Sequence, residues 1–109
     1  ENKVVFYDAV YFFQKLRQMG KQPEIVEMCH KLLGPVLRYD EEHKTQLTDT
    51  FRCLLVNNEN VKKTAEQLFI HKNTVLQRKN KLTELFGYSP FDMPYRLNFL
   101  MIFDIMEKK

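Results

Sequence analysis

The sequence predicts an all-α fold, arranged as a multi-helix bundle. Apolar residues recur at spacings of three and four over most of the chain, and helix-capping or helix-breaking residues separate these stretches. With 109 residues, 44% hydrophobic and 13% aromatic, the chain can build the core of one domain. Residues 4–7, Val-Val-Phe-Tyr, are strand-forming types, so a short N-terminal strand remains an open alternative.

The first two helices are predicted from apolar spacing and from their end residues. Val10, Phe13 and Leu16 mark a helix that Gly20 can end. Pro23 suits the first turn of a second helix, which runs through Leu33. Gly34 and Pro35 then break that helix.

A third helix is predicted to begin at Asp40, because aspartate is a good N-cap and Glu41 and Glu42 suit the positive end of the helix dipole. Its apolar face repeats at helical spacing and comprises Leu47, Phe51, Leu54 and Leu55. The helix is expected to end near Asn57 or Asn58.

Two short helices and a final helix follow. Asn60 is a good N-cap for a helix with Val61, Thr64, Ala65 and Leu68 on one face, and Phe69 and Ile70 form an apolar turn after it. The next helix covers residues 72–86 and stops at Gly87, and Asp92 with Pro94 opens a last helix to about residue 106. That last helix is apolar nearly all round. Either it packs in this domain's own core, or part of it, with Tyr11, Phe12 and Phe13, contacts a second copy or another domain.

Charge is concentrated in residues 60–82. This segment holds six of the 17 Lys and Arg residues and only one of the 14 acidic residues, so the net charge of +3 arises there. A basic patch on two short helices joined by a tight turn is typical of a nucleic-acid-binding helix-turn-helix.

The spacing within this segment fits such a motif. Counting Val61 as the first position, the small residue Ala65 is fifth, where steeply crossing helices leave no space for a longer side chain, and apolar residues occupy positions eight, ten and fifteen: Leu68, Ile70 and Val75. The outer face of the second helix then presents base-reading candidates, which are Lys72, Asn73, Gln77 and Arg78. The phosphate-binding candidates are Lys62 and Lys63 on the first helix, Lys81 on the second, and Thr74 beside the N-terminus of the second helix. The alternative function is a helical protein-interaction or oligomerisation module with a basic face.

Other functions lack sequence support. Cys29 and Cys53 are expected to be buried thiols, and the three histidines are too dispersed to predict a metal site. We expect no enzyme activity and no cofactor, because the chain has no nucleophile elbow, phosphate-binding loop or dinucleotide fingerprint. With no membrane-spanning stretch and no signal peptide, a cytoplasmic protein is expected.

The stretch TAEQLFIHKNTVLQRKNKL, preceded by LLGPVLRYDEEHKTQL, resembles the C-terminal helix-turn-helix domain of the PucR/CdaR class of bacterial transcription regulators. The resemblance spans residues 32–100 and implies binding of double-stranded DNA at the C-terminus of a longer chain whose upstream sensor domain is absent here. It implies a division into a connecting segment, residues 1–31, and a DNA-binding domain, residues 32–109. Paired half-sites on DNA favour a homo-oligomer, most simply a dimer.

Carried over by residue, the resemblance places Thr64, Ala65 and Leu68 in the first helix of the motif, and His71, Asn73, Thr74 and Arg78 around the recognition helix. His71 either contacts DNA or is a turn histidine bonded to the backbone. The chain departs from the family at Lys79, where leucine is usual, and at Leu76, where a basic residue is usual. The Lys79 stem is expected to lie along apolar surface. Leu76 either contacts a thymine methyl or reflects a shift in packing.

Overall fold

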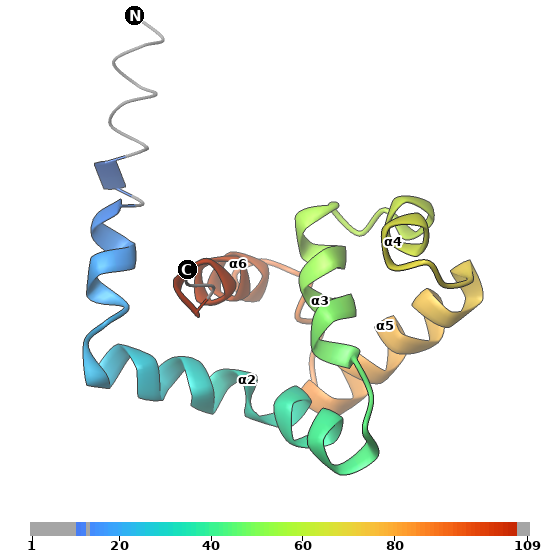
Figure 1. Ribbon diagram of the computed structural model, residues 1–109, viewed down its shortest axis with the longest axis horizontal. Helices are drawn as coiled ribbons and strands as arrows, with labels where there is room; N and C mark the ends of the chain where they lie inside the picture. Colours follow the sequence, from blue (N-terminus) through green and yellow to red (C-terminus); the bar gives the residue numbers. More distant parts are fainter. Residues whose placement is uncertain (1–10, 13, 107–109) are drawn as a thin grey trace, which may run out of the picture.

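The structure is a computed structural model that describes residues 11, 12 and 14–106 of the chain (Figure 1). Residues 11, 12 and 14–19 are helical, and five helices follow: α2 (Pro23–His43), α3 (Leu47–Val56), α4 (Val61–Leu68), α5 (Lys72–Phe86) and α6 (Tyr95–Met106). The predicted all-α fold is confirmed, since residues 11, 12 and 14–106 contain no strand. The strand considered at residues 4–7 lies outside the described residues.

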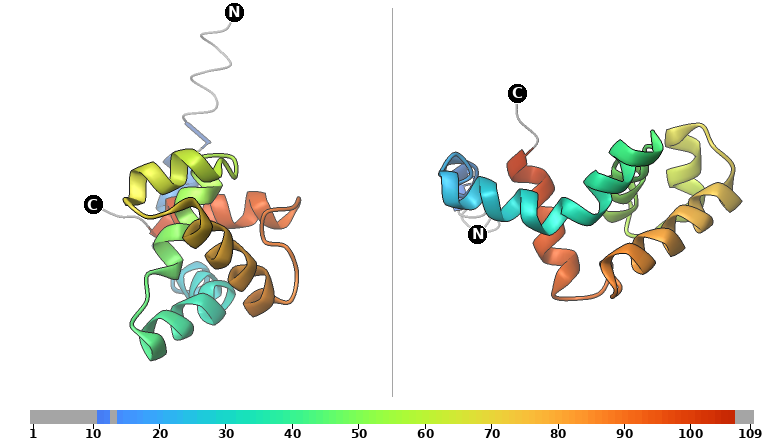
Figure 2. Two further views of the ribbon diagram at one scale, coloured as in Figure 1. Left: turned by 90° about the vertical axis from the view of Figure 1, so that its right-hand side faces the viewer. Right: turned by 90° about the horizontal axis from the view of Figure 1, so that it is seen from below.

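Helix α3 lies at the centre of the bundle and packs against α2, α4, α5 and α6. Its Phe51 is fully buried and contacts four other aromatic rings, those of Phe86, Phe91, Phe99 and Phe103, with centroid separations of 5.0 to 5.5 Å. Such tilted and edge-on ring pairs add to the stability gained from burial. Helices α4 and α5 lie at one end of the molecule, and residues 14–19 lie at the other (Figures 1 and 2).

Helix α2 continues through Gly34 and Pro35, so the predicted break there was wrong. Proline inside a helix removes one backbone hydrogen bond and costs about 3 kcal/mol. Two features offset that cost: Gly34 has no Cβ to clash with the following proline ring, and Leu33 and Val36 on either side of the pair are buried in the core. Packing against α3, α5 and α6 therefore outweighs the local preference.

Asp40 lies inside α2, so its predicted place as the N-cap of the next helix was wrong. Its carboxylate nevertheless accepts hydrogen bonds from the backbone N–H groups of Leu47 and Thr48, at 2.7 and 2.8 Å, at the start of α3. The hydroxyls of Thr45 and Thr48 also donate to it. Burial alone would raise the pKa of the Asp40 carboxyl, but these hydrogen bonds outweigh it and lower the pKa. Asp40 thus caps α3 from the preceding helix.

The end of α3 and the boundaries of α4 and α5 are as predicted. The Asn60 side chain accepts from the backbone N–H of Lys63 at 2.9 Å and caps α4. Gly87 ends α5 in the left-handed conformation, with φ of 80°, and its N–H donates to the Thr83 carbonyl. Helix α3 ends at Val56, with Asn57 as its C-cap.

Helix α6 packs largely into this domain's own core. Phe99 and Ile102 are buried, and Leu100, Phe103 and Met106 pack half-buried against the core. Leu97 is 48% exposed, and Tyr11 and Phe12 are more exposed still. Phe13 lies outside the described residues. Contact with another copy through the exposed part stays a prediction. Within the described part of the chain, no helix is both long and apolar enough to cross a membrane.

Candidate nucleic-acid interface

Helices α4 and α5 pack together as a helix-turn-helix, and the spacing predicted from the sequence is confirmed. Ala65 on α4 and Val75 on α5 are buried, Ile70 in the turn packs half-buried against the core, and Leu68 is half-buried. Ala65 is the small residue of the motif, and its burial where the two helices contact agrees with the need for a close approach. Residues on the opposite side of α5 remain open to solvent.

The turn between the two helices differs from the expected apolar turn in one residue. Ile70 is half-buried and its N–H donates to the Ala65 carbonyl at 3.1 Å. Phe69, however, adopts the left-handed conformation with φ of 59° and is 92% exposed. The left-handed conformation closes the C-terminus of α4, and it costs about 1 kcal/mol for a residue with a Cβ.

A side-chain network fixes α4 on the end of α3. The buried Asn57 amide donates to Thr64 Oγ1 at 3.2 Å and to Gln67 Oε1 at 2.9 Å. Cys53 Sγ also donates to Gln67 Oε1, at 3.2 Å. Cys53 is half-exposed and belongs to this network, so the prediction that it is a buried apolar thiol was wrong. Cys29 is buried as predicted, and burial raises the pKa of its thiol.

The exposed face of α5 carries three amides. Asn73 and Gln77 are exposed, as the sequence predicts, and Asn80 is exposed one turn further along the helix. Sequence reasoning missed Asn80, although its spacing of seven from Asn73 and three from Gln77 places it on the same face. Leu76 is also on this face and is 45% exposed, which disfavours a packing role for it within this domain. Lys72 is exposed at the start of the helix.

His71 is the N-cap of α5. Its Nδ1 accepts a hydrogen bond from the backbone N–H of Asn73 at 3.0 Å, so of the two alternatives for His71 the structure shows the bond to the backbone. Because Nδ1 acts as the acceptor, a neutral ring carries its proton on Nε2. The exposed ring can therefore still donate to an anion outside the helix. The neighbouring Thr74 is half-buried in the first turn.

Two of the cations of α5 are held by other parts of the fold. Arg78 is half-buried, and its Nη1 donates to Thr50 Oγ1 on α3 at 2.8 Å, so it does not lie on the fully exposed face. The Lys79 ammonium lies 3.2 Å from Glu59 Oε2 and 5.5 Å from the Phe91 ring centroid. This placement agrees with the prediction that the Lys79 stem follows apolar surface.

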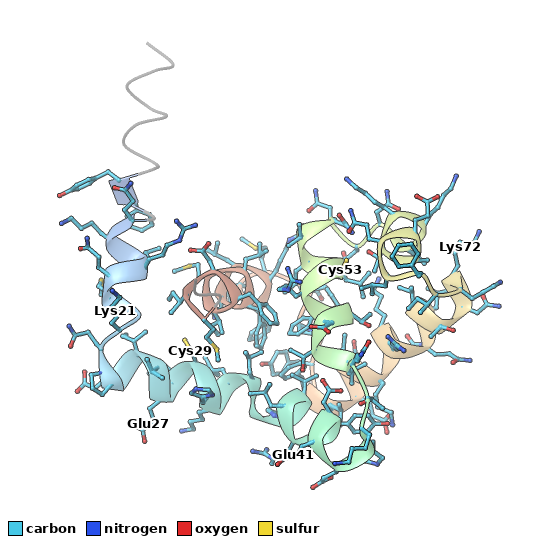
Figure 3. All side chains as sticks on the ribbon, in the orientation of Figure 1. Lys21, Glu27, Cys29, Glu41, Cys53 and Lys72 are labelled. Atoms are coloured by element: carbon cyan, nitrogen blue, oxygen red, sulfur yellow. The ribbon has the colours of Figure 1, made fainter. Side chains whose placement is uncertain are left out.

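Further cations lie on both flanks of the exposed face. Lys62 and Lys63 are exposed in the first turn of α4. On the other flank, the Lys81 ammonium lies 3.3 Å from Glu84 Oε1 and 5.4 Å from the Tyr39 ring centroid. Figure 3 shows the Lys72 side chain at the α4 and α5 end of the molecule, far from Lys21.

Comparison with known proteins adds a family and a relative. Residues 47–105 match the family described as the PucR C-terminal helix-turn-helix domain. The "Proline-responsive transcriptional activator PutR" of Bacillus subtilis (strain 168) is 32% identical over 109 residues, which are the whole of this chain and 26% of the relative. The chain thus spans about a quarter of that relative's length. No solved structure matches the chain.

Proposed function

Because the chain belongs to the family of PucR C-terminal helix-turn-helix domains, which bind DNA in transcription regulators, we propose that α5 reads specific sequences in the major groove of double-stranded DNA. One observation carries the proposal: the amides of Asn73, Gln77 and Asn80 lie together on the solvent-exposed face of the second helix of the motif. Asparagine and glutamine can pair with the N6 and N7 edge of adenine, and an α-helix fits the major groove.

Two further side chains on this face suit base edges. Leu76 can contact the methyl group of thymine, and Lys72 can reach guanine O6 and N7 from the first turn of α5. The exposure of Leu76 supports this role, since water otherwise covers an apolar side chain at the centre of a polar face.

Phosphate contacts are assigned to side chains around that face. Lys62 and Lys63 project from the start of α4, and His71 Nε2 can donate to a phosphate oxygen beside the N-terminus of α5. The Thr74 hydroxyl can add a contact in the same turn. Lys81 suits a phosphate on the far flank. Arg78 remains a DNA-contact candidate through the N–H groups that its bond to Thr50 leaves free.

The longer protein and its assembly are also proposals. The relative spans far more sequence than this chain, so the domain is assigned to the C-terminal end of a longer bacterial transcription regulator, acting in the cytoplasm. The upstream part would carry the sensor. A single recognition helix makes few base contacts, and two copies on paired half-sites multiply specificity. We assign residues 32–109 to DNA binding and residues 1–31 to the connection.

The test is selection of binding sites from a randomised duplex pool, followed by fluorescence anisotropy on the selected and scrambled duplexes. Asn73→Ala and Gln77→Ala should each lower the preference for the selected sequence by about 1–3 kcal/mol. Lys63→Ala should weaken binding to all duplexes about equally and make the dependence of log K on log salt shallower by about 1.

The matched control is Lys21→Ala, since Lys21 is exposed at the opposite end of the molecule (Figure 3) and should leave binding unchanged. Binding that never exceeds the random pool and disappears with salt would favour the alternative function, a helical interaction module with a basic face. A two-fold symmetric selected sequence would support use as a dimer.

A further inference from the structure

A groove lies between α5 and the loop that joins α2 to α3. It is lined chiefly by Tyr39, Lys44 and Gln46 on one wall and by Gln77, Arg78 and Lys81 on the other, and we call it the α2–α3 groove. Figure 1 shows the loop after α2 rising to α3 in this region. Sequence patterns assign Lys44 and Gln46 no role, because they lie far along the chain from the basic segment.

The α2–α3 groove is cationic. Lys44, Arg78 and Lys81 line it, and none of its lining residues is acidic. Two acidic residues bond to lining residues: Asp40 accepts from Thr45 and Leu47, and Glu84 pairs with Lys81. The Asp40 carboxylate already accepts four hydrogen bonds from Thr45, Leu47 and Thr48 and forms no ion pair with these cations. Glu84 is 71% exposed, so its pair with Lys81 is weak in water and a phosphate can replace it.

The walls of the groove are held in place before any ligand binds. Thr50 Oγ1 accepts from Arg78 Nη1 at 2.8 Å, which fixes the guanidinium at the groove. The Tyr39 ring stacks on the His43 ring at 4.1 Å and lies beneath the Lys81 ammonium. A cationic site with fixed side chains loses less entropy on binding an anion than flexible surface lysines do.

The position of the groove identifies its ligand. Gln77 lies both on the amide-bearing face of α5 and in the groove, so the two surfaces are continuous. Lys72 and Lys81 are nine residues apart on α5, two and a half turns, and project from opposite flanks. Lys72 lines a separate hollow together with Lys62 and His71. A helix in the major groove has one DNA strand along each flank.

We propose that the α2–α3 groove holds a backbone phosphate of the DNA strand opposite to the one contacted by Lys62 and Lys63, with Lys44 as an additional phosphate-binding residue. This inference rests on the proposed function, DNA binding through α5. The domain then contacts both DNA strands that border the major groove. The α2–α3 loop takes part in DNA binding although it lies outside the helix-turn-helix.

The variant that tests this is Lys44→Asn in the full chain. Lys44 adopts the left-handed conformation, with φ of 56°, which asparagine tolerates well, so the change removes the charge without straining the loop. Binding to the selected duplex is measured by anisotropy over a series of salt concentrations. The slope of log K against log salt should become shallower by about 0.9, and the ratio of affinities for selected and scrambled duplexes should not change.

Two variants control for this result. Lys44→Arg keeps the charge and should retain the wild-type slope, and Lys21→Ala removes a distant charge and should also retain it. Thermal unfolding of Lys44→Asn checks that the fold is intact. If wild type and Lys63→Ala differ in slope while Lys44→Asn matches wild type, the groove proposal is overturned and the proposed function stands.

A second experiment tests which DNA strand each lysine contacts. Single neutral methylphosphonate linkages are placed in turn on each strand of the selected duplex, and the loss of affinity is measured for wild type, Lys44→Asn and Lys63→Ala. Each variant should be insensitive to the linkage that its missing lysine contacts, and the two linkages should lie on opposite strands. Insensitive linkages on the same strand would overturn the assignment, and absence of any DNA binding by wild type would overturn the proposed function as well.

Discussion

At the scale of single residues, Asp40 lies in α2 and caps the helix that follows it. Its carboxylate caps α3 through the backbone N–H groups of Leu47 and Thr48 and also accepts from two hydroxyls. Asp40→Asn replaces one of the two accepting oxygens with an NH₂ group that cannot accept, so it should lower the free energy of unfolding at pH 7 by about 1 kcal/mol, the usual net contribution of a hydrogen bond. Urea unfolding followed by circular dichroism measures this.

The pH dependence of that loss follows from the lowered pKa of Asp40. A group whose pKa is lower in the folded state stabilises the fold above its unfolded pKa and loses that contribution as pH falls through its folded pKa. The difference between wild type and Asp40→Asn should therefore shrink below about pH 4. Glu41→Gln is the control, because Glu41 is exposed, and it should have little effect. A difference that stayed constant with pH would contradict the ionised cap.

The candidate site could be predicted where it depends on helical spacing alone. The exposure of Lys72, Asn73 and Gln77 follows from the burial of Val75 and Leu82, which the apolar pattern indicates. Arg78 could not be placed in this way, because its partner Thr50 lies 28 residues away and no local pattern joins them. Lys44 could not be predicted for the same reason: the packing of α2 and α3 against α5 brings it beside Gln77, Arg78 and Lys81, which lie far from it in sequence.

At the scale of elements, predictions succeeded where a cap and its partner are close in sequence. Asn60 caps an N–H group three residues later and Gly87 bonds to a carbonyl four residues earlier, so both helix ends were found. The start of α3 was misplaced because its cap, Asp40, lies seven residues before Leu47. The predicted break in α2 failed for a different reason, since core burial on both sides of Gly34 and Pro35 overrides local preference.

Helix continuity at Pro35 gives a prediction about α2. Pro35→Ala restores an N–H group that can bond to the Lys31 carbonyl within the helix. We expect the free energy of unfolding to rise by about 1–2 kcal/mol, which is the cost of an interior proline less the stiffness that proline gives the unfolded chain. Urea unfolding checks this. The matched control is Pro23→Ala at the first turn of α2, where proline costs nothing and the change should be neutral or slightly destabilising. If Pro35→Ala lowered stability, α2 would be interrupted in solution.

At the scale of the whole molecule, α2 joins the two ends of the bundle. It packs against α3, α5 and α6, and its Tyr39 lines the α2–α3 groove. The residues proposed to contact DNA thus lie on α4, α5 and the adjoining α2–α3 loop, while α6 packs against α2 and α3 (Figure 2). The family match begins at residue 47, yet α2 contributes Cys29, Leu33 and Val36 to the core. The folded domain therefore includes more of the chain than the segment that matches the family, residues 47–105.

This arrangement predicts where the chain can be shortened. The proposed domain boundary between residues 31 and 32 falls inside α2, so a chain of residues 32–109 loses the buried Cys29 and the half-buried Ile25. Its free energy of unfolding should fall by about 2 kcal/mol relative to the full chain. A chain of residues 21–109 keeps all of α2 but loses the exposed ion pair of Arg17 with Asp104, worth at most about 1 kcal/mol, and the close packing of the buried Gly20 against Ile105. Urea unfolding of the three chains gives the order of their stabilities. The DNA affinity of residues 21–109 should equal that of the full chain. Equal stability of residues 32–109 and 21–109 would show that the first half of α2 is a connector, and the domain would then begin at residue 32.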